Sequence, residues 1–548
     1  MESSNQFLGT ERIGKLMQKY AIPCIISLLV GALYNIVDQI FIGQGVGMLG
    51  NAATNIAFPI SIICTATALL LGIGSASNYN LESGAGNSKK ASQIVGTGLA
   101  VLIISGISIG IIVLVFLDPL LHLFGVTPDV LPLAQDYTGI TAFGIPFLIL
   151  TTGGNHLIRA DRSPTYSMAC MLTGAIINTI LDPLFIFGFQ WGIKGAAGAT
   201  VIGQVISGFL VIIYFCKFRN LELTRDMLRP KGAMLKAIAS LGLAACINQI
   251  AMAIVQITMN NTLRHYGASS VYGTDIPLAC VGVISKVNMV FMAICIGISQ
   301  GCQPIWGFNY GAGRFSRVRK TFMMAFKISL LVGIVFFLCF QFFPRQLVSV
   351  FGTGSQEYFR FAERYFRIFM LMTFINGIQP MSSGFFTSIG EARLGIMVSL
   401  TRQVIFLLPL ILLFPLFMGI DGVMYAGPIA DGAAAFVAIG FALRELRRMK
   451  QLESQQAPKE QAHETKESGK KPYVRNFNYA KAIRQLEEQI EKKETELEAL
   501  RELRFEPEYY HDFKKMNELD QQIDDVHVEI DRLMQKWEEY SEQLEQNA

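Results

Sequence analysis

The stretch AIINTILDPLFIFGFQWGIKGAAGAT, residues 175–200, decides the fold class because it places polar side chains inside an apolar run. Residues 168–189 are mostly apolar, and about 20 such residues are enough for a helix to cross a bilayer. Asn178 and Asp182 lie four positions apart and share one face of that helix. A carboxylate at the centre of a membrane helix costs about 2.5 to 3.5 kcal/mol, so we expect an ion or proton site facing a cavity.

Similar apolar runs recur as far as Leu443, in a chain of 548 residues that is 51% hydrophobic, 16% charged and has a mean hydropathy of +0.40. This pattern predicts an all-α polytopic membrane protein with twelve transmembrane helices. The amino terminus leads into a full-length span without a cleavable signal, so the first span is expected to stay. The twelve spans are expected near residues 16–43, 54–78, 93–117, 133–155, 165–189, 193–216, 236–262, 277–302, 321–343, 358–385, 394–418 and 422–443.

The basic residues are distributed unequally between the two sets of loops. One set, together with both span-flanking ends, holds about 22 Lys and Arg, whereas the other set holds about six. Because Lys and Arg concentrate on the cytoplasmic side, both ends of the chain are predicted to be cytoplasmic. We therefore expect a multi-pass protein of the plasma membrane, which is the inner membrane in a cell with two membranes.

The two halves of the apolar region resemble each other at an interval near 227 residues. GIGSASNYNLESGAG ends at Gly86, GISQGCQPIWGFNYGAG ends at Gly313, and each closes the second span of its half. Six spans per half predict two pseudo-symmetric lobes related by an axis along the membrane normal, as in two-lobed transporters. The expected domains are an amino lobe (1–220), a carboxy lobe (221–448), a polar linker (449–478) and a coiled-coil hairpin (479–548).

Polar groups in three different spans are expected at one depth in the membrane. With a rise of about 1.5 Å per residue, Asp38 lies about five residues inside the outer end of the first span. Asp182 and Thr200 each lie about seven residues inside the outer ends of the fifth and sixth spans. Pro23 lies fifteen residues before Asp38, the only acid of its span, and a proline well inside a helix tends to kink it.

These residues, with the repeat, resemble the multidrug and toxic compound extrusion (MATE) family of cation-coupled exporters. The resemblance covers about residues 10–448 and rests on VDQIFIG, RADRSPTYSM, NTILDPLFIFG, GAAGAT and SQGCQPIWGFNYGAG. It implies no cofactor, a proton or sodium as coupling ion, and a bend of the first span near Pro23 on ion binding. It also implies that the amino-lobe cation site consists of Asp38, Asn178, Asp182 and Thr200, with Tyr137 and Asn155 in its hydrogen-bond network.

The carboxy lobe departs from one branch of that family. NorM-type members carry acids deep in the seventh and tenth spans, where this chain has only amides: Gln256, Asn260, Asn261, Asn376 and Gln379. The resemblance is therefore to the DinF-like branch, with the coupling site in the amino lobe and no sodium site expected in the carboxy lobe.

A substrate cleft between the lobes is expected to be lined by Gln256, Lys286, Met289, Asn376 and Gln379. Lys286 in the eighth span has two interpretations: a cleft residue that responds to anionic substrates or to the coupling acid, or a structural partner of a backbone carbonyl or Asp431. Arg402 in the eleventh span has the same structural alternative.

The polar tail returns to helical periodicity after residue 478. Apolar residues spaced three and four apart form two coiled-coil seams. The longer seam comprises Met516, Leu519, Ile523, Val526, Ile530, Leu533, Trp537, Tyr540 and Leu544, and the shorter one Ile483, Leu486, Ile490, Leu497 and Leu500. RFEPEYYHDF interrupts them, which predicts an antiparallel helical hairpin.

This tail resembles the C-terminal coiled coil of ABC-F type ATPases, through EPEYYHDFKKMNELDQQI and the WEEY ending, but the chain has no G-x-x-x-x-G-K-[ST] motif. From residue 479 onward ten Lys and Arg face twenty Asp and Glu, which argues against phosphate binding. Self-association or a protein partner is expected instead, and the membrane part is not expected to bind nucleic acid.

The predicted function is a cation-coupled antiporter, driven by protons rather than sodium, that exports amphipathic, often cationic, drugs by alternating access. Its expected partners are a small-molecule substrate and the lipid bilayer. Two alternatives stay open: a lipid-linked sugar flippase or metabolite exporter of the same fold, and a degenerate transporter that tethers the coiled coil to the membrane. An enzyme is not expected, because no nucleophile, base and orienting group combine in the sequence and no metal cluster is present.

Overall fold

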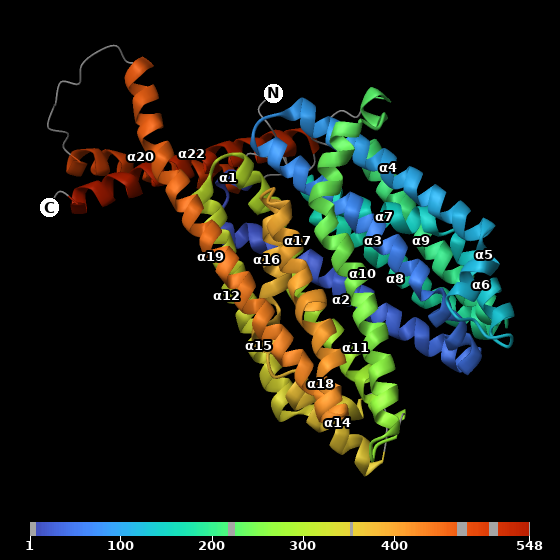
Figure 1. Ribbon diagram of the computed structural model, residues 1–548. Helices are drawn as coiled ribbons and strands as arrows, with labels where there is room; N and C mark the ends of the chain where they lie inside the picture. Colours follow the sequence, from blue (N-terminus) through green and yellow to red (C-terminus); the bar gives the residue numbers. More distant parts are fainter. Residues whose placement is uncertain are drawn as a thin grey trace. The chain divides into compact units, whose positions relative to one another are not determined.

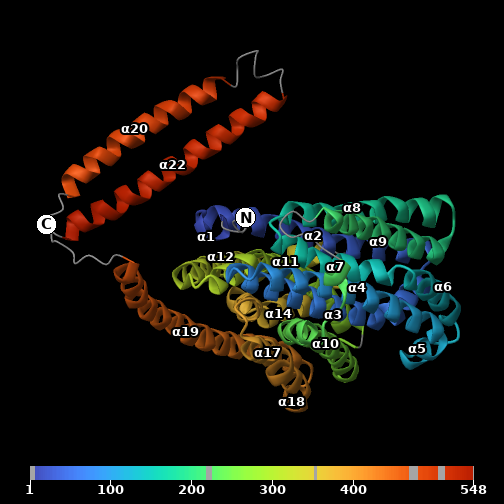
Figure 2. The same cartoon turned by 90° about the horizontal axis from the view of Figure 1, so that it is seen from above.

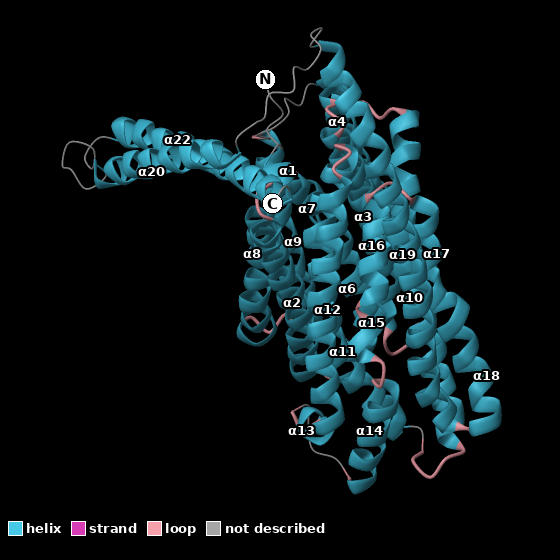
Figure 3. Cartoon of the chain, turned by 90° about the vertical axis from the view of Figure 1, so that its left-hand side faces the viewer, coloured by secondary structure: helices cyan, strands magenta, loops and turns pink. Residues whose placement is uncertain are grey.

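The computed structural model describes residues 7–217, 225–273, 275–350, 355–467, 479–503 and 513–546. These residues form helices and connecting loops, with no strand among them (Figure 3). The chain divides into two compact units, residues 1–459 and residues 460–548, which are described separately below. The expected all-α fold is therefore confirmed for the part of the chain that the structure describes.

The first half of the larger unit contains long helices joined by short turns. In Figure 1 these blue and cyan helices diverge from the yellow and orange ones toward the lower edge of the picture. They are α1 (Phe7–Thr10), α2 (Ile13–Gly45), α3 (Met48–Gly84), α4 (Ser88–Val115), α5 (Leu117–Leu123), α6 (Leu131–Ala142), α7 (Ile145–Ala160), α8 (Pro164–Pro183), the π-helical turn η1 (Leu184–Gly188) and α9 (Gly192–Cys216).

The second half of the larger unit follows a comparable order. Its elements are η2 (Arg225–Leu228), α10 (Gly232–Ala268), α11 (Asp275–Gly311), α12 (Phe315–Phe342), α13 (Pro344–Ser349), α14 (Gln356–Phe369), α15 (Thr373–Asn376), α16 (Ile378–Ser388), α17 (Ala392–Leu400), the π-helical turn η3 (Thr401–Leu407), α18 (Leu408–Met418) and α19 (Ile420–Glu467). A π-helical turn thus interrupts the segment that precedes the last long helix in each half.

Ten helical segments of the described residues are long and apolar enough to cross a membrane, and α6 with α7, bent by 54°, makes an eleventh. The exception among the twelve expected spans is the tenth, 358–385, which is not one continuous helix. It is divided into α14, α15 and α16. The sequence explains the break: α14 carries the charged residues Arg360, Glu363, Arg364 and Arg367, and Gly377 and Pro380 follow.

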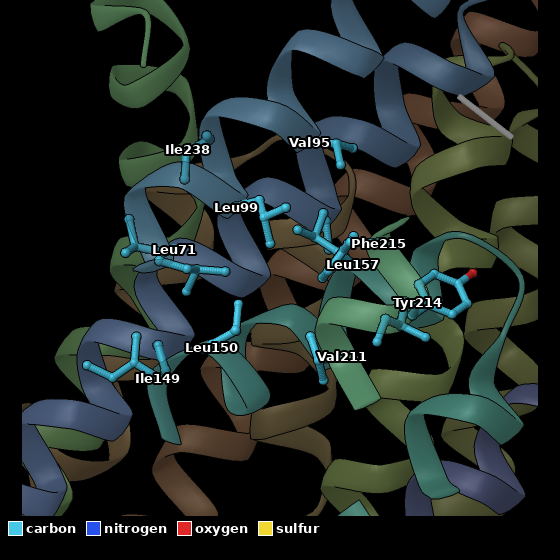
Figure 4. Close-up of a cluster of buried hydrophobic side chains, with 14 of the residues drawn as sticks. Leu71, Val95, Leu99, Ile149, Leu150, Leu157, Val211, Tyr214, Phe215 and Ile238 are labelled. Carbon is cyan, nitrogen blue, oxygen red and sulfur yellow. The ribbon is translucent and has the colours of Figure 1, made fainter. Parts of the chain in front are cut away.

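Buried apolar side chains from several helices form the core of the first half. Leu71, Leu99, Leu157 and Val211 come from α3, α4, α7 and α9 and belong to one hydrophobic cluster (Figure 4). Glycines let these helices approach closely: a Cβ added to Gly72 would lie 2.5 Å from the Cα of Gly153. Small residues at helix contacts are the common way to pack helices in a membrane.

Glycines also mark where helices of the two halves touch. A Cβ on Gly84 of α3 would lie 2.1 Å from the carbonyl oxygen of Phe308 on α11, and a Cβ on Gly311 would lie 2.1 Å from the carbonyl oxygen of Leu81. Gly84 and Gly311 are 227 positions apart, as are Leu81 and Phe308, and 227 is the interval of the sequence repeat. The contact is therefore reciprocal: each half places a glycine against the corresponding backbone of the other.

Two more helix pairs meet in the same reciprocal way. On α3 and α10, a Cβ on Gly242 would lie 1.7 Å from the Leu70 carbonyl oxygen. On α11 and α2, a Cβ on Gly297 would lie 2.8 Å from the Cα of Ile25. Leu70 and Gly297 are again 227 positions apart. The halves thus join along α2, α3, α10 and α11, through contacts that only glycine permits.

The last helix of the larger unit continues beyond the membrane segment. α19 reaches Glu467, so the first part of the polar stretch expected as a linker is helical, and the remainder, 468–478, lies outside the described residues. The helix continues because residues 444–467 are rich in Glu, Gln, Lys, Arg and Ala, which favour helices. Met449 of this extension is buried, and Glu453 forms an ion pair with Arg319 of α12.

The smaller unit contains α20 (Tyr479–Leu503) and α22 (Phe513–Gln546), which pack against each other. Trp537 Nε1 donates to Glu487 Oε1 at 3.0 Å, and Lys493 Nζ lies 2.9 Å from Glu529 Oε2. The partners run in opposite sequence directions, so the pair is antiparallel, as expected. The described seam residues buried in it are Leu486, Leu497, Leu519, Ile523, Val526 and Ile530; the interrupting residues 504–512 lie outside the described part.

Candidate cation site

α8 and α9 bring Asn178, Asp182 and Thr200 together because small residues let the two helices pack closely (Figure 2). A Cβ on Gly203 of α9 would lie 2.8 Å from the carbonyl oxygen of Gly174 on α8. The turn between the helices depends on Gly192, whose φ of +56° is one that side-chain-bearing residues rarely adopt. The local sequence therefore positions both polar faces toward each other.

Asn178 is the centre of the hydrogen bonds in this cluster. Its Nδ2 atom donates to Asp182 Oδ1 at 3.3 Å and to Thr200 Oγ1 at 3.2 Å. Asp182 is fully buried, Asn178 is nearly so, and Thr200 is half-buried. The spacing of four residues and the common depth expected from the sequence thus correspond to direct contacts.

α2 contributes Asp38, which is also buried, and α2 packs against α8. The carboxyl groups of Asp38 and Asp182 lie close enough to interact directly. Tyr34, one helical turn before Asp38, places its hydroxyl within electrostatic range of both acids. The sequence analysis missed Tyr34, although its position four residues before Asp38 on one helix face could have indicated it.

Three acceptor oxygens of the cluster have no hydrogen-bond partner among the described residues: Asp38 Oδ1, Asp182 Oδ2 and Asn178 Oδ1. Buried acceptors normally have a partner, because leaving one without a donor costs about 1–3 kcal/mol. A proton or a monovalent cation would satisfy these acceptors. Among the described residues no group of three or more His, Cys, Asp or Glu is arranged to hold a metal ion.

A small cavity of about 60 Å³, lined by both polar and apolar side chains, adjoins the site. Thr200 and Tyr137 line it together with Thr138 and Gln204, whose Oγ1 and Oε1 atoms have no hydrogen-bond partner among the described residues. One water molecule needs about 10–15 Å³ of such space, so the cavity is large enough to hold water. Hydration of the site from this side is thus sterically possible.

The remaining residues expected at the site have different positions. Tyr137 on α6 lies within electrostatic range of Asp38 and Asp182. Asn155 on α7 is buried, but neither side-chain atom has a hydrogen-bond partner among the described residues, so no hydrogen bond joins it to the cluster. Pro23 is buried inside α2, which continues through it, and its carbonyl accepts from Ser27 Oγ at 2.7 Å.

The residues expected to line a cleft divide into two groups. Lys286 and Met289 on α11 are exposed, and Gln256 on α10 is half-buried and donates to Asn260 at 3.1 Å. Asn376 and Gln379 are buried instead. The side-chain nitrogen of Gln379 donates to the Val398 carbonyl at 2.9 Å, so this amide joins α16 to α17.

The intramembrane arginine of the second half is paired. Arg402 Nε donates to Asp431 Oδ1 at 2.5 Å, and both side chains are buried. This is the structural interpretation of Arg402 left open by the sequence. Lys286 forms no ion pair with any described residue, so the same interpretation does not extend to it.

Comparison with protein-family models shows to which family the chain belongs. The model of the MatE family matches residues 23–184 and 244–413, more than half of the chain, and these residues include Asp38, Asn178 and Asp182. The chain belongs to the MatE family. It is thus a multi-pass membrane transporter of the MATE group, and not an enzyme. A second model, the ABC transporter C-terminal domain, matches residues 475–542, which include the antiparallel hairpin.

Individual relatives and structures agree with this assignment. The multidrug export protein MepA of Staphylococcus aureus (strain NCTC 8325 / PS 47) is 26% identical over 435 residues, covering 78% of this chain and 92% of its own. A protein named FAD transporter from Shewanella oneidensis is 27% identical over 430 residues, covering 76% and 92%. A multidrug resistance MATE family transporter solved in an outward-facing conformation shares the fold, with a TM-score of 0.76 and 22% identity over 82% of this chain and all of its own.

Proposed function

We propose that the protein is a proton-coupled antiporter that exports amphipathic, often cationic, compounds by alternating access. The observation that carries the proposal is that two buried carboxyl groups, those of Asp38 and Asp182, lie within interaction distance of each other. Two ionised carboxylates repel each other, and a proton on one of them would replace that repulsion with a hydrogen bond. The pair is therefore suited to take up and release a proton, and the family membership supplies the context of ion-driven efflux.

Protons are favoured over sodium because of the charge balance of the cluster. Two close carboxylates away from water repel each other, and a shared proton removes that repulsion. No cation from the described residues pairs with either acid. In the proposed cycle, the outward-open carrier takes up protons at Asp38 and Asp182, and the resulting change near Pro23 bends α2 and expels the substrate.

The finer architecture belongs to the same proposal: twelve spans in two six-helix lobes, 1–220 and 221–448, related by a pseudo-two-fold axis, with both ends cytoplasmic. The reciprocal contacts of Gly84 and Gly311 support the axis, because a two-fold relation requires each half to contact the equivalent position of the other. A DinF-like branch is supported by the lack of acids near Gln256 and Gln379.

The test is ethidium efflux from proteoliposomes, first under an imposed pH gradient and then under a sodium gradient. We expect the pH gradient to drive efflux and Asp38→Asn or Asp182→Asn to reduce it to the background rate, because an amide cannot exchange a proton. Asp129→Asn, an exposed loop carboxylate, is the matched control and should transport normally. Efflux that persists in both site variants, or that follows only the sodium gradient, would contradict proton coupling at this pair.

A metabolite exporter of the same fold is the second candidate. A relative of 27% identity is named for transport of FAD, a molecule with two phosphates, and Lys286 offers an unpaired cation in the second half. The membrane-tether alternative is disfavoured by the complete cluster of Asp38, Asn178, Asp182 and Thr200. The tether would be favoured only if the full-length protein transported no compound while its coiled coil still bound a partner.

A further inference from the structure

The face of α11 that meets the other half of the protein continues outward to Lys286. Gly297 on this face lies against Ile25 of α2. Lys286 lies eleven residues before Gly297, which is about three helical turns, so both residues share one face. Gly297 is packed against α2, whereas Lys286 is exposed. The two helices have therefore separated at the level of Lys286, and its side chain faces the space between the halves.

The same relation holds for α10 and α3. Gly242 lies against Leu70, and Gln256 and Asn260 follow it by fourteen and eighteen residues, about four and five turns. Both amides are therefore on the face of α10 that is directed at α3 near Gly242. Asn260 is exposed and Gln256 is half-buried, so α10 also presents polar groups toward the space between the halves.

Gln256 and Asn260 of α10 and Lys286 of α11, which are carried by two helices in contact with each other, are here called the amide–lysine face. Residues 232–311 contain one carboxylate, Asp275, at the first position of α11. Lys286 lies eleven residues further along, about 16 Å in a helix. A lysine at that depth without a counter-charge is costly in lipid, and such residues usually mark a substrate or ion pathway.

The opposing helices offer an apolar surface. Ile36 lies eleven residues after Ile25, about three turns along α2, and Ile63 lies seven residues before Leu70, about two turns along α3. Ile63 is 49% exposed and Ile36 is half-buried. The space between the halves is thus bounded by apolar residues on the amino-terminal side and by amides and an ammonium group on the carboxy-terminal side.

We propose that the substrates include amphipathic molecules with a carboxylate or phosphate group, and that this group binds at the amide–lysine face. Lys286 supplies a charge-assisted hydrogen bond, and the amides of Gln256 and Asn260 donate to the remaining oxygens. The apolar body of the substrate packs against Ile36 and Ile63. The inference rests on the proposed transport function, which it extends from cations to anions and zwitterions, and it does not depend on the coupling ion.

The experiment compares two ligands that differ in one phosphate. Flavin mononucleotide and riboflavin share a planar ring system, and their intrinsic fluorescence reports binding to the full-length protein in phosphatidylcholine nanodiscs. We expect the wild-type protein to bind flavin mononucleotide about tenfold more tightly, in line with one charge-assisted hydrogen bond. Lys286→Gln should remove the preference, Lys286→Arg should keep it, and Lys327→Gln, which removes an exposed lysine of α12, should leave it unchanged.

Several outcomes would overturn the proposal. Equal binding of both flavins by the wild-type protein would do so, as would a preference that persists in Lys286→Gln. A lipid phosphate is the alternative source of the anion. In that case the wild-type protein would show no flavin preference and would retain phosphatidylglycerol from purification, whereas Lys286→Gln would lose this lipid. That result would mean that Lys286 binds lipid and not substrate. Because binding is measured without a gradient, failure here leaves the result of the Asp38 and Asp182 efflux test unaffected.

Discussion

The two halves of the membrane unit use equivalent positions for opposite purposes. Asp38 lies thirteen residues after Ile25, the α2 residue that contacts Gly297. In the second half, the corresponding contact is made by Gly242 of α10, and thirteen residues later stands Val255. Asp38 belongs to a buried acid cluster, whereas Val255 is buried in a hydrophobic core. One helix position therefore holds an ionisable group in one half and a core residue in the other.

The interrupted segments differ in the same way. Gly195 packs against Phe185, and Gly422 packs against Phe414. Counting back three and seven residues from each phenylalanine gives Asp182 and Asn178 in the first half but Ile411 and Leu407 in the second. Val255, Leu407 and Ile411 all belong to one hydrophobic cluster. The comparison indicates that the backbone arrangement supports either an ion site or a packed core, and that a few side chains decide which.

The two halves also differ in whether a buried carboxylate has a cationic partner. Asp431 in the second half is paired with Arg402, whereas Asp38 and Asp182 have no cation beside them among the described residues. The ion pair gives Asp431 a counter-charge. The acid pair of the first half has none among the described residues, and this is the difference that the proposed coupling at Asp38 and Asp182 depends on.

The largest expected effect comes from breaking that pair. Arg402→Met leaves Asp431 as an uncompensated buried charge and should destabilise the protein by about 3–5 kcal/mol, measured by thermal unfolding in detergent. The double variant Arg402→Met with Asp431→Leu should recover most of the loss. Asp182→Asn should change stability little, because its site already accommodates a neutral form. A larger loss in Asp182→Asn than in Arg402→Met would contradict this distinction between the halves.

The reciprocal glycines provide a sharper test of the two-fold relation. Gly84→Ala and Gly311→Ala each bring a Cβ to 2.1 Å from a backbone oxygen of the other half, and such overpacking typically costs about 1–3 kcal/mol. The same unfolding measurement should give similar losses for the two variants. Gly432→Ala is the control, since its Cβ would meet nothing within 4 Å, and it should be neutral or stabilising. Tolerance of one interface variant and not the other would argue against equivalent contacts.

Local spacing and helix depth were sufficient to predict which polar side chains of the candidate site lie together. Asn178 and Asp182 had to share a face because they are four residues apart, and a common depth brought Thr200 and Asp38 into the same prediction; the structure places all four together. Features that depend on tertiary packing were not predictable. The burial of Gln379 depends on α17, which no local pattern reveals. The break of the tenth span, in contrast, has a local basis in the charges of α14 and in Gly377 and Pro380, which the expected span of 358–385 did not take into account.

Of the changes considered, removal of the coiled coil is expected to have the smallest effect on transport and stability. A chain ending after Glu467 keeps α19 and removes the whole acidic hairpin, whose described hydrogen bonds and ion pairs lie within the hairpin itself. Ethidium efflux and unfolding temperature should therefore match those of the full-length protein. A chain ending after Lys450 also removes the Arg319–Glu453 ion pair, and because partly exposed pairs contribute about 0–1 kcal/mol, a slight loss of stability without loss of transport is expected. If the chain ending after Glu467 had already lost efflux, the hairpin would be part of the transport mechanism. The difference between the two halves would then not be sufficient to explain coupling.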